Sequence, residues 1–287
     1  ANFAGSADYI PASASTTFTI GAAPTVTHVT EAGGIYTGAP IPAAGYVAGI
    51  GGASIATPVF TYYLASDTKY AHPLSGAPSD VGSYRLKAAF AGNPNYLPSS
   101  TTGTFAIGKG SAVIYAADDG GAYTGHPIPA TGYVADAGGT SIAKPVFTYY
   151  LSSDTKYAHP LSSVPSAPGN YNYKASFAGN ANYLSTFTTG YFTISKAPTV
   201  IHAADDGGVY NGKPYPATGY VASVVTGAKI ATPVFTYYLA GDTSYSHPLS
   251  GAPSSPGSYL FKAIFAGNAY YLATATTGTI TIRPKSK

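Results

Sequence analysis

Residues 79–91 read SDVGSYRLKAAFA, and their pattern decides the fold. From Tyr84 onward every second residue is apolar, and side chains alternate between the two faces of a β-strand. One face of the predicted strand therefore carries Tyr84, Leu86, Ala88 and Phe90. The same alternation returns in residues 169–177 and 257–265. This apolar face is predicted to be the core face of a β-sheet.

The strand belongs to a motif series that repeats along the chain. Tyr36, Tyr123 and Tyr210 are 87 residues apart each time, and the third copy carries one inserted residue between Tyr220 and Pro233. A fixed period of this kind indicates tandem structural units. We expect the C-terminal strands of a truncated repeat at residues 1–21, followed by whole repeats at 22–108, 109–196 and 197–287. A whole repeat has the size of a small domain with its own core.

Composition excludes several classes of protein. Charged residues make up 9%, with 14 Lys+Arg against 11 Asp+Glu, and no basic stripe indicates nucleic-acid binding. Because cysteine is absent, disulfides, thiol catalysis and cysteine-ligated metals are excluded. No apolar run reaches the roughly 18 residues of a membrane span. Weakly charged surfaces repel one another little, so the composition favours association.

Methionine is also absent, so we expect a processed chain or a segment of a longer one. Residues 3–20 match the closing phrase of each whole repeat, but no front half of a repeat precedes them. Two interpretations stay open: the front half lies upstream in a longer array, or residues 1–20 add strands to another subunit, as donated strands do at open sheet edges. We favour the first, because the third repeat looks complete and shows no matching gap.

Strands are the only elements that the sequence supports. Gly (34) and Pro (23) interrupt the chain every few residues, and short runs rich in Val, Ile, Thr, Tyr and Phe lie between them. In the first whole repeat this predicts strands at 24–30, 42–49, 58–65, 69–73, 83–91 and 102–108. The fold class is therefore all-β, a series of β-sandwiches joined by short linkers at 21–23, 108–110 and 195–197. Such linkers leave little slack between repeats.

The residues before the fifth strand carry a family resemblance. Asp80-Val-Gly-Ser-Tyr84 spells D-x-G-x-Y, the arrangement of a tyrosine corner in immunoglobulin-like sandwiches. The corner tyrosines would be Tyr84, Tyr171 and Tyr259. With the phrases YTG, TYYL, PLSGAPS and AFAGNPNY, the chain resembles the tandem bacterial Ig-like and MBG-type repeats of large secreted and cell-surface proteins. The resemblance implies immunoglobulin-like units arranged end to end in extracellular stalks, adhesins or fibres, without catalytic residues. A β-grasp unit is the alternative, but it requires a helix.

Paired carboxylates occur where one repeat is followed by the next, at an expected junction between domains. Asp118-Asp119 and Asp205-Asp206 each precede two glycines and could ligate Ca²⁺ together with backbone carbonyls. The first repeat has only Glu31 there, and a turn explains Asp and Gly equally well. We favour the turn. No cofactor is expected, with calcium as the one left open.

A histidine recurs in every repeat beside an aspartate. The pairs are Asp67 and His72, Asp154 and His159, and Asp242 and His247. No nucleophile recurs in a motif that would activate it, so a hydrogen-bonded loop is favoured over a metal site or a catalytic site. His28, His126 and His202 do not recur in all three repeats and carry less weight.

Adjacent tyrosines recur on the third strand. They are Tyr62 and Tyr63, Tyr149 and Tyr150, and Tyr237 and Tyr238. Neighbouring side chains on a strand point to opposite faces, so one ring of each pair points away from the core. That ring is either covered by a neighbour or free to stack on a sugar or a protein.

Three functions are weighed on these grounds. The first is a non-enzymatic structural protein, part of an extracellular or cell-surface filament that serves adhesion or matrix, whose partners are copies of itself or further repeats of the same chain. The second is a carbohydrate- or surface-binding module that uses exposed tyrosines against surface glycans. The third, an enzyme, is the weakest, because each candidate carboxylate or histidine is either part of the repeated scaffold or isolated.

Overall fold

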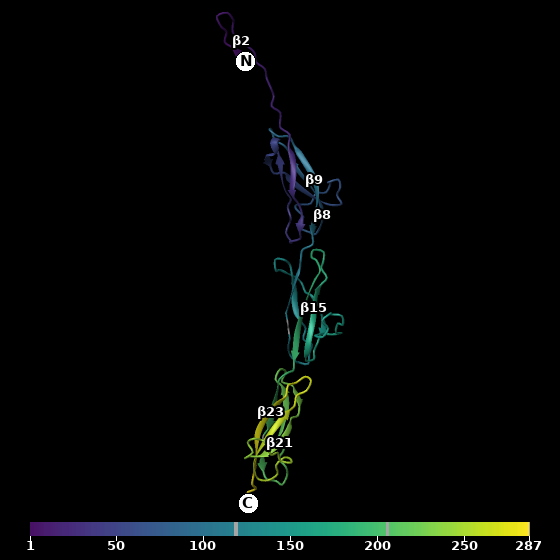
Figure 1. The fold of residues 1–287 in the computed structure, drawn as a ribbon, viewed down its shortest axis with the longest axis vertical. Coiled ribbons are helices and arrows are strands. Elements are labelled where there is room, and N and C mark those ends of the chain that lie inside the picture. Colours follow the sequence, from purple (N-terminus) through teal and green to yellow (C-terminus); the bar gives the residue numbers. More distant parts are fainter. Residues whose placement is uncertain (118–119, 205–206, 287) are drawn as a thin grey trace. The chain divides into compact units, whose positions relative to one another are not determined.

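The computed structural model describes residues 1–117, 120–204 and 207–286 of the chain (Figure 1). The chain divides into two compact units: residues 1–112 together with 179–184, and residues 113–178 together with 185–287. Within the described residues one 3₁₀ turn, η1 (Ile50–Gly52), is the sole helical element. The β-grasp alternative therefore lacks the helix it needs.

The first whole repeat consists of seven strands. They are β3 (Val26–Glu31), β4 (Gly34–Ile35), β5 (Ala44–Ala48), β6 (Ser54–Ala56), β7 (Val59–Leu64), β8 (Gly82–Phe90) and β9 (Ser99–Gly108). One sheet has the order β3-β5-β6 and is antiparallel. The other has the order β4-β9-β8-β7, in which β4 runs parallel to β9 and the remaining pairs are antiparallel.

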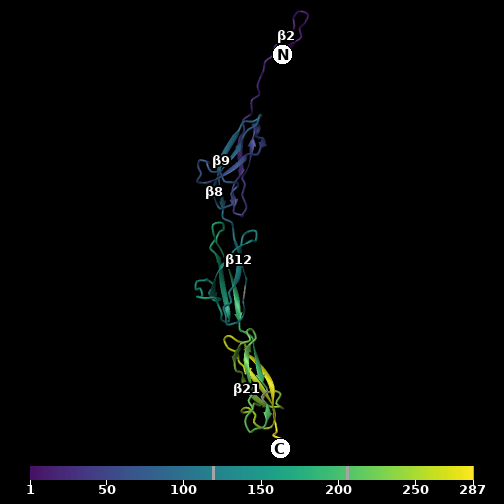
Figure 2. The same ribbon diagram turned by 180° about the vertical axis from the view of Figure 1, so that it is seen from behind.

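The other two repeats reproduce this order (Figures 1 and 2). The second contains β10 (Val113–Ala117), β11 (Gly121–Ala122), β12 (Thr131–Ala135), β13 (Ser141–Ala143), β14 (Val146–Leu151), β15 (Gly169–Phe177) and β16 (Thr186–Ser195). The third contains β17 (Thr199–Ala204), β18 (Gly208–Val209), β19 (Thr218–Ser223), β20 (Lys229–Ala231), β21 (Val234–Leu239), β22 (Gly257–Phe265) and β23 (Thr274–Arg283).

Each repeat is an immunoglobulin-like sandwich with one departure from the standard order. The first strand divides between the two sheets, and its second half lies parallel to the last strand, as β4 does on β9. The third strand of the smaller sheet, however, comes directly after its neighbour in a hairpin, as β6 follows β5. In the immunoglobulin fold that place belongs to a strand from later in the chain.

The core lies between the sheets where the alternating pattern predicted it. In the first repeat Tyr84, Leu86 and Ala88 are buried, and they pack with Phe105 and Ile107 of the last strand. The third repeat has the equivalent cluster, which includes Tyr259, Phe261, Ala263, Ile280 and Ile282. Apolar area removed from water stabilises a fold by about 25 cal/mol per Å², so these residues hold each sandwich closed.

Two sequence expectations about strands are corrected. The predicted strand at residues 69–73 is wrong: those residues form turns and bends, and Tyr70 has a φ of 55°. Positive φ takes a residue out of the extended region that a strand requires. The structure also adds β4 and β6, which at two and three residues were too short to show a periodic pattern.

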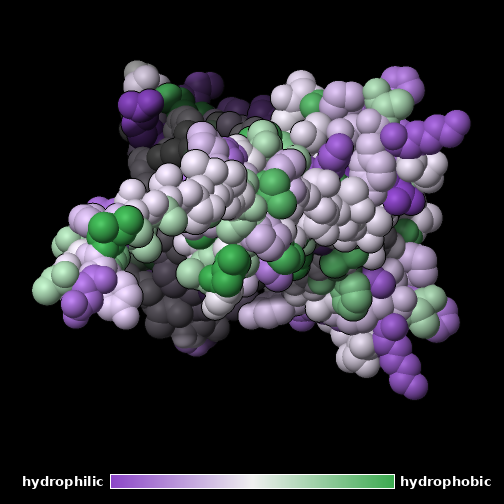
Figure 3. Space-filling model, turned by 90° about the horizontal axis from the view of Figure 1, so that it is seen from above, coloured by the Kyte–Doolittle hydropathy of each residue, from purple (hydrophilic) through white to green (hydrophobic). Residues whose placement is uncertain are grey.

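The N-terminal segment forms only a short hairpin of β1 (Asn2–Phe3) and β2 (Ala12–Ser13). Phe18 and Ile20, which match the buried Phe105 and Ile107, are 83% and 85% exposed. In Figure 3 the strongly hydrophilic side chains, in purple, stand mainly around the outline of the view, with pale and some hydrophobic green side chains between them.

Candidate functional site

The three corner tyrosines fix the loop before the long core strand. The hydroxyl of Tyr84 donates to the carbonyl oxygen of Asp80 at 2.9 Å. The hydroxyls of Tyr171 and Tyr259 donate to the carbonyls four residues before them at 2.9 and 3.0 Å. Burial raises the pKa of the Tyr84 and Tyr171 hydroxyls. The Tyr84 and Tyr171 hydroxyls therefore stay neutral donors, and through these hydrogen bonds the three corner tyrosines serve the scaffold.

The adjacent tyrosines do not form a binding surface. Tyr62, Tyr63, Tyr149, Tyr150, Tyr237 and Tyr238 are all 6–7% exposed, so of the two alternatives left open for the outward ring, the low exposure fits the covered one and not a free stacking surface. The first ring of a pair enters the core, where the hydroxyl of Tyr62 accepts the N–H of Ala43 at 2.7 Å. The second ring points to the other face, as the alternation requires, but the repeat's own loop covers it.

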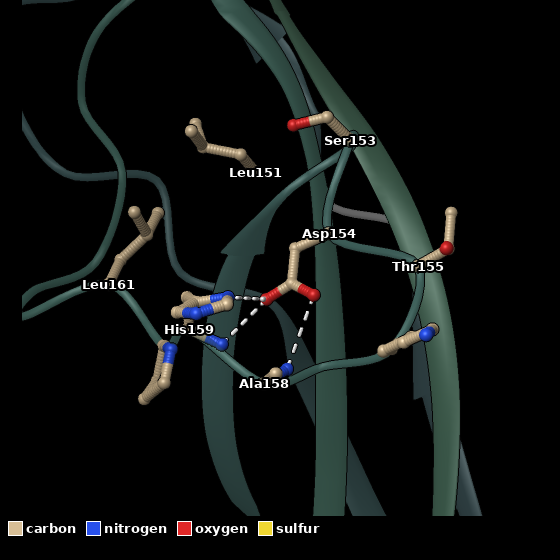
Figure 4. Close-up of a pocket in the computed structure, with 9 residues that line it drawn as sticks. Leu151, Ser153, Asp154, Thr155, Ala158, His159 and Leu161 are labelled. Carbon is tan, nitrogen blue, oxygen red and sulfur yellow. Dashed lines mark hydrogen bonds and ion pairs between the residues drawn. The ribbon is translucent and has the colours of Figure 1, made fainter.

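The covering loop is held by its aspartate. In the second repeat the Asp154 carboxylate accepts the N–H groups of Ala158 and His159 at 3.2 and 2.7 Å (Figure 4). The first and third repeats bind their loops in the same way, through Asp67 and Asp242. The loop then presents Tyr157, at a φ of 54°, edge-on to Tyr150 with the ring centroids 5.1 Å apart.

These backbone hydrogen bonds decide the electrostatics of the loop. The N–H of His159 is the largest influence that lowers the pKa of Asp154, and the equivalent N–H groups lower the pKa of Asp67 and Asp242. A carboxylate that accepts backbone N–H groups is stabilised in its charged form. The histidine ring contributes less, because its Nδ1 is 3.8 Å from the Asp154 Oδ2 and the side chain is 90% exposed.

The depression beside the loop does not contain a catalytic arrangement. It has a volume of about 670 Å³ in the second repeat and is lined by residues that include Ser153, Asp154, Thr155 and His159. No hydrogen bond joins these hydroxyls to the His159 ring among the described residues, and the carboxylate is already occupied by backbone N–H groups. The geometry can shape a loop, but it does not activate a nucleophile.

The candidate metal ligands were compared with the described structure. The candidate calcium residues Asp118, Asp119, Asp205 and Asp206 lie outside the described residues. Within the described part of the chain, no group of three or more His, Asp or Glu side chains is placed to hold a metal ion.

Two tyrosine contacts recur at the junctions between repeats. We call Tyr36, Tyr123 and Tyr210 the YxG tyrosines, and the turns that contain Tyr96, Tyr183 and Tyr271 the NxxY turns. In the first unit Tyr36 meets Tyr183 edge-on, with ring centroids 5.3 Å apart. In the second unit Tyr123 lies 4.9 Å from Tyr270 and 5.5 Å from Tyr271. Each contact joins a YxG tyrosine to the NxxY turn of the following repeat, not to the turn of its own repeat.

The asparagine of each NxxY turn shapes the turn. The Asn180 side-chain oxygen accepts the N–H groups of Asn182 and Tyr183, both at 2.9 Å. Asn93 and Asn268 do the same in their repeats. Asparagine favours such turns because its side chain can bond the backbone two residues on. The turn tyrosine is therefore presented in a fixed position.

Stacked aromatic pairs on the smaller sheets, partly exposed in the first repeat and exposed in the second, form a feature that sequence reasoning missed. On the smaller sheet of each repeat two rings stack across neighbouring strands: His28 on Tyr46, Tyr115 on Tyr133 and His202 on Tyr220, with centroids 4.8 to 5.1 Å apart. Tyr115 and Tyr133 are 51% and 43% exposed. His28 and His202 seemed isolated because the second repeat has tyrosine there. The repeated signal is the aromatic character of the position.

Comparisons with known proteins add little to this geometry. No known family model matches the chain, and no curated protein is significantly similar in sequence. Among solved structures, the chain is similar to Sidekick-1 immunoglobulin domains 1–5, with 14% identity over 90% of this chain and a TM-score of 0.30. The chain spans 59% of the length of that structure.

Two further solved structures are similar at the same level. They are the three N-terminal domains of the bacteriophage RB49 highly immunogenic outer capsid protein Hoc (12% identity, 92% of this chain, all of that chain, TM-score 0.27) and Drosophila N-cadherin EC1-4 (8% identity, 93% of this chain, 76% of that chain, TM-score 0.25). At these TM-scores the likeness carries no functional argument. No helix among the described residues is long and apolar enough to cross a membrane.

Proposed function

We propose that this chain is a segment of an extracellular or cell-surface filament or stalk, built from tandem Ig-like repeats of the bacterial MBG type and serving adhesion or matrix. The observation that carries the proposal is the recurring joint between a YxG tyrosine and an NxxY turn. The linker residue at each of these joints, Gly110 or Ala197, is buried. A chain whose repeats were meant to move freely would not need to bury its linkers.

A non-enzymatic role fits the residues that could have supported chemistry. The carboxylates of the recurring aspartates accept hydrogen bonds from loop N–H groups. The side chains of the recurring histidines are 90–91% exposed. Both features repeat because the loop repeats, which is a structural reason for their presence.

Electron microscopy of the native material, paired with the intact mass of its denatured chain, tests this function. Beaded filaments whose bead spacing equals one repeat are the expected result. A denatured mass far above 29.1 kDa would place the beads within one long chain, and a mass near 29.1 kDa would mean that separate chains join. Isolated particles of single-chain size, without filaments under any condition, would contradict the proposal.

A carbohydrate-binding module is the second candidate, and the exposed rings favour it. Tyr115 and Tyr133 form a stacked pair on one face, and Phe187 and Tyr191 of β16 are 63% and 70% exposed on the other sheet. Aromatic rings with polar tips suit contacts that are half apolar and half wet. A glycan array with the full chain tests this function. A saturable signal that Tyr133→Ala removes and Leu184→Ala leaves intact would support it, and an empty array would contradict it.

A further inference from the structure

The composition of the chain makes tyrosine its most easily oxidised side chain. Cysteine, methionine and tryptophan are absent, whereas tyrosine occurs 27 times. Cysteine and methionine are the residues on which protein oxidation usually falls, and without cysteine no disulfide can join one repeat to the next. The phenol rings are therefore the groups left for an oxidative bond between repeats.

The second joint, between the second and third repeats, brings three of these phenols together. Tyr123 comes from the second repeat, and Tyr270 and Tyr271 come from the NxxY turn of the third. The Tyr123 and Tyr270 ring centroids are 4.9 Å apart, and Tyr271 meets Tyr123 edge-on at 5.5 Å. Tyr270 is 43% exposed, so a dissolved oxidant can reach the cluster.

Backbone hydrogen bonds hold both sides of this cluster in place. The N–H of Tyr123 donates to Ser195 O at 2.9 Å. Two residues further on, Ala197 donates its N–H to Tyr270 O and accepts the N–H of Leu272, both at 2.9 Å. The same short stretch of backbone thus binds both partners, and rings that are held together in this way can react without a search through solution.

The first joint has the same construction with a different ring geometry. Gly110 donates its N–H to Asn182 O and accepts the N–H of Leu184, both at 2.9 Å. Tyr36 meets Tyr183 at an interplanar angle of 86°, whereas the angle at Tyr123 and Tyr270 in the second joint is 34°. The unpaired electron of a phenoxyl radical lies above and below the ring plane, so rings that face each other combine more readily than rings that meet edge-on.

We propose that the joints between repeats are sites of oxidative tyrosine coupling, and that Tyr123 and Tyr270 form the main bond. The oxidant is hydrogen peroxide acting through a haem peroxidase, which removes one electron and one proton from each phenol. A carbon–carbon bond then forms between a ring carbon beside each phenol oxygen, and the hydrogens of these carbons move to the oxygens. The peroxide takes up both electrons and both protons and leaves as two molecules of water.

Such a bond makes the joint permanent. An aromatic contact opens and closes, but a carbon–carbon bond keeps the second and third repeats attached at the joint even when both unfold. The inference goes beyond the proposed filament, which it strengthens at its joints without cysteine. The filament does not depend on it, because joints can also hold by contacts alone.

The test is oxidation of the full chain at micromolar concentration by a haem peroxidase with limiting hydrogen peroxide, followed by trypsin digestion and mass spectrometry. The expected main product joins the peptide that contains Tyr123 to the peptide that contains Tyr270 and has lost two hydrogen atoms. A smaller yield is expected for Tyr36 with Tyr183. Groups held in one chain meet at an effective concentration in the millimolar range, so bonds within a chain should exceed bonds between chains about a thousandfold.

Tyr123→Phe distinguishes this bond from other tyrosine chemistry. Phenylalanine keeps a ring in the joint but forms no phenoxyl radical, so the product with Tyr270 should vanish while the product of Tyr36 with Tyr183 remains. Tyr191→Phe removes a 70% exposed phenol that Tyr123 does not contact. It is the matched control and should leave both products at the wild-type yield. In urea, which unfolds the joints, the preference for these pairs should be lost.

Three results would overturn the inference. The first is a product at the Tyr270 peptide that Tyr123→Phe leaves unchanged, and the second is the same distribution of bonds in folded and unfolded chains. The third is coupling confined to Tyr115 and Tyr133, whose exposed rings are stacked within the second repeat. None of these results contradicts the filament, which electron microscopy tests separately. A bond between Tyr123 and Tyr270 in a protein that forms no filament would uphold the inference and contradict the proposed function.

Discussion

The ring of Tyr123 lies 4.9 Å from the ring of Tyr270, across the junction between the second and third repeats. The two rings are tilted by 34°, and the neighbouring Tyr271 meets Tyr123 edge-on. Aromatic pairs in such geometries contribute beyond the area they bury. We expect this contact to keep Ala197 buried, and the rate of proteolysis beside Ala197 tests that expectation.

Tyr123→Ala is expected to open this junction. An aromatic pair contributes about 0.5–1.5 kcal/mol, so the open population should rise about 2- to 12-fold. Trypsin cleavage after Lys196, beside the buried Ala197, should accelerate by that factor and is followed by mass spectrometry. Tyr191→Ala serves as the control, because its ring is 70% exposed and is not one of the rings that Tyr123 contacts. Equal cleavage rates in Tyr123→Ala and the wild type would contradict the role of the contact.

Tyr84→Phe is expected to destabilise the first repeat. The substitution removes the hydroxyl that donates to Asp80 O at 2.9 Å while it keeps the ring stacked on Phe105. A hydrogen bond of this kind contributes about 0.5–1.5 kcal/mol. Hydrogen exchange in the β8 and β9 peptides measures the free energy of opening of this repeat alone. As the control, Tyr115→Phe changes an exposed tyrosine and should leave hydrogen exchange in the β15 and β16 peptides unchanged. If Tyr84→Phe also leaves the free energy of opening unchanged, the tyrosine-corner hydrogen bond does not stabilise the repeat.

The long core strands could be predicted because one face of each is buried and the other is not. Tyr84, Leu86 and Ala88 alternate with polar residues for that reason, and the expected core face was confirmed. The loop after β7 could not be predicted in the same way. Its shape depends on the Asp67 carboxylate and on the positive φ of Tyr70, and neither produces a periodic pattern.

The tyrosine pairs show what the alternation of side chains along a strand cannot predict. Alternation correctly places Tyr62 and Tyr63 on opposite faces, but it does not say what lies over the outer ring. Tyr63 is covered by Tyr70, whose ring centroid is 5.1 Å away in a loop that the sequence suggested was a strand. The joints were missed for a related reason, since Tyr123 and Tyr270 are separated by more than one whole repeat and only the fold brings them together.

The glycine before the last core residues is expected to respond differently in the first and third repeats. A side-chain carbon on Gly103 would lie 3.8 Å from Leu86, an ordinary contact, whereas one on Gly278 would overlap the ring of Phe261. Gly103→Ala should therefore be neutral or stabilise its repeat by up to about 1 kcal/mol through the unfolded chain. Gly278→Ala should destabilise its repeat by about 1–3 kcal/mol, the usual result of overpacking.

Hydrogen exchange of β9 and β23 peptides in the two glycine variants measures both effects in one protein. The two positions are equivalent in the repeat, so each variant is the control for the other. Equal destabilisation by both substitutions would indicate that the glycine serves the backbone rather than the space beside the Leu86 or Phe261 side chain.

Acid is expected to loosen the aspartate loops before the sandwiches unfold. Hydrogen bonds from His159 and Ala158 hold the pKa of Asp154 below its usual 3.8. A carboxyl group with a lowered pKa in the folded protein contributes stability that is complete above its unfolded pKa and is lost as the pH falls through the folded pKa. After correction for the intrinsic pH dependence of exchange, protection of the Ala158 and His159 amides should be constant above about pH 5 and fall below about pH 4.

In Asp154→Ala these amides should be poorly protected at every pH, while the Ala71 and His72 amides of the unchanged first repeat keep the wild-type profile. Protection that persists unchanged to pH 2 in the wild type would mean that the carboxylate does not hold the loop.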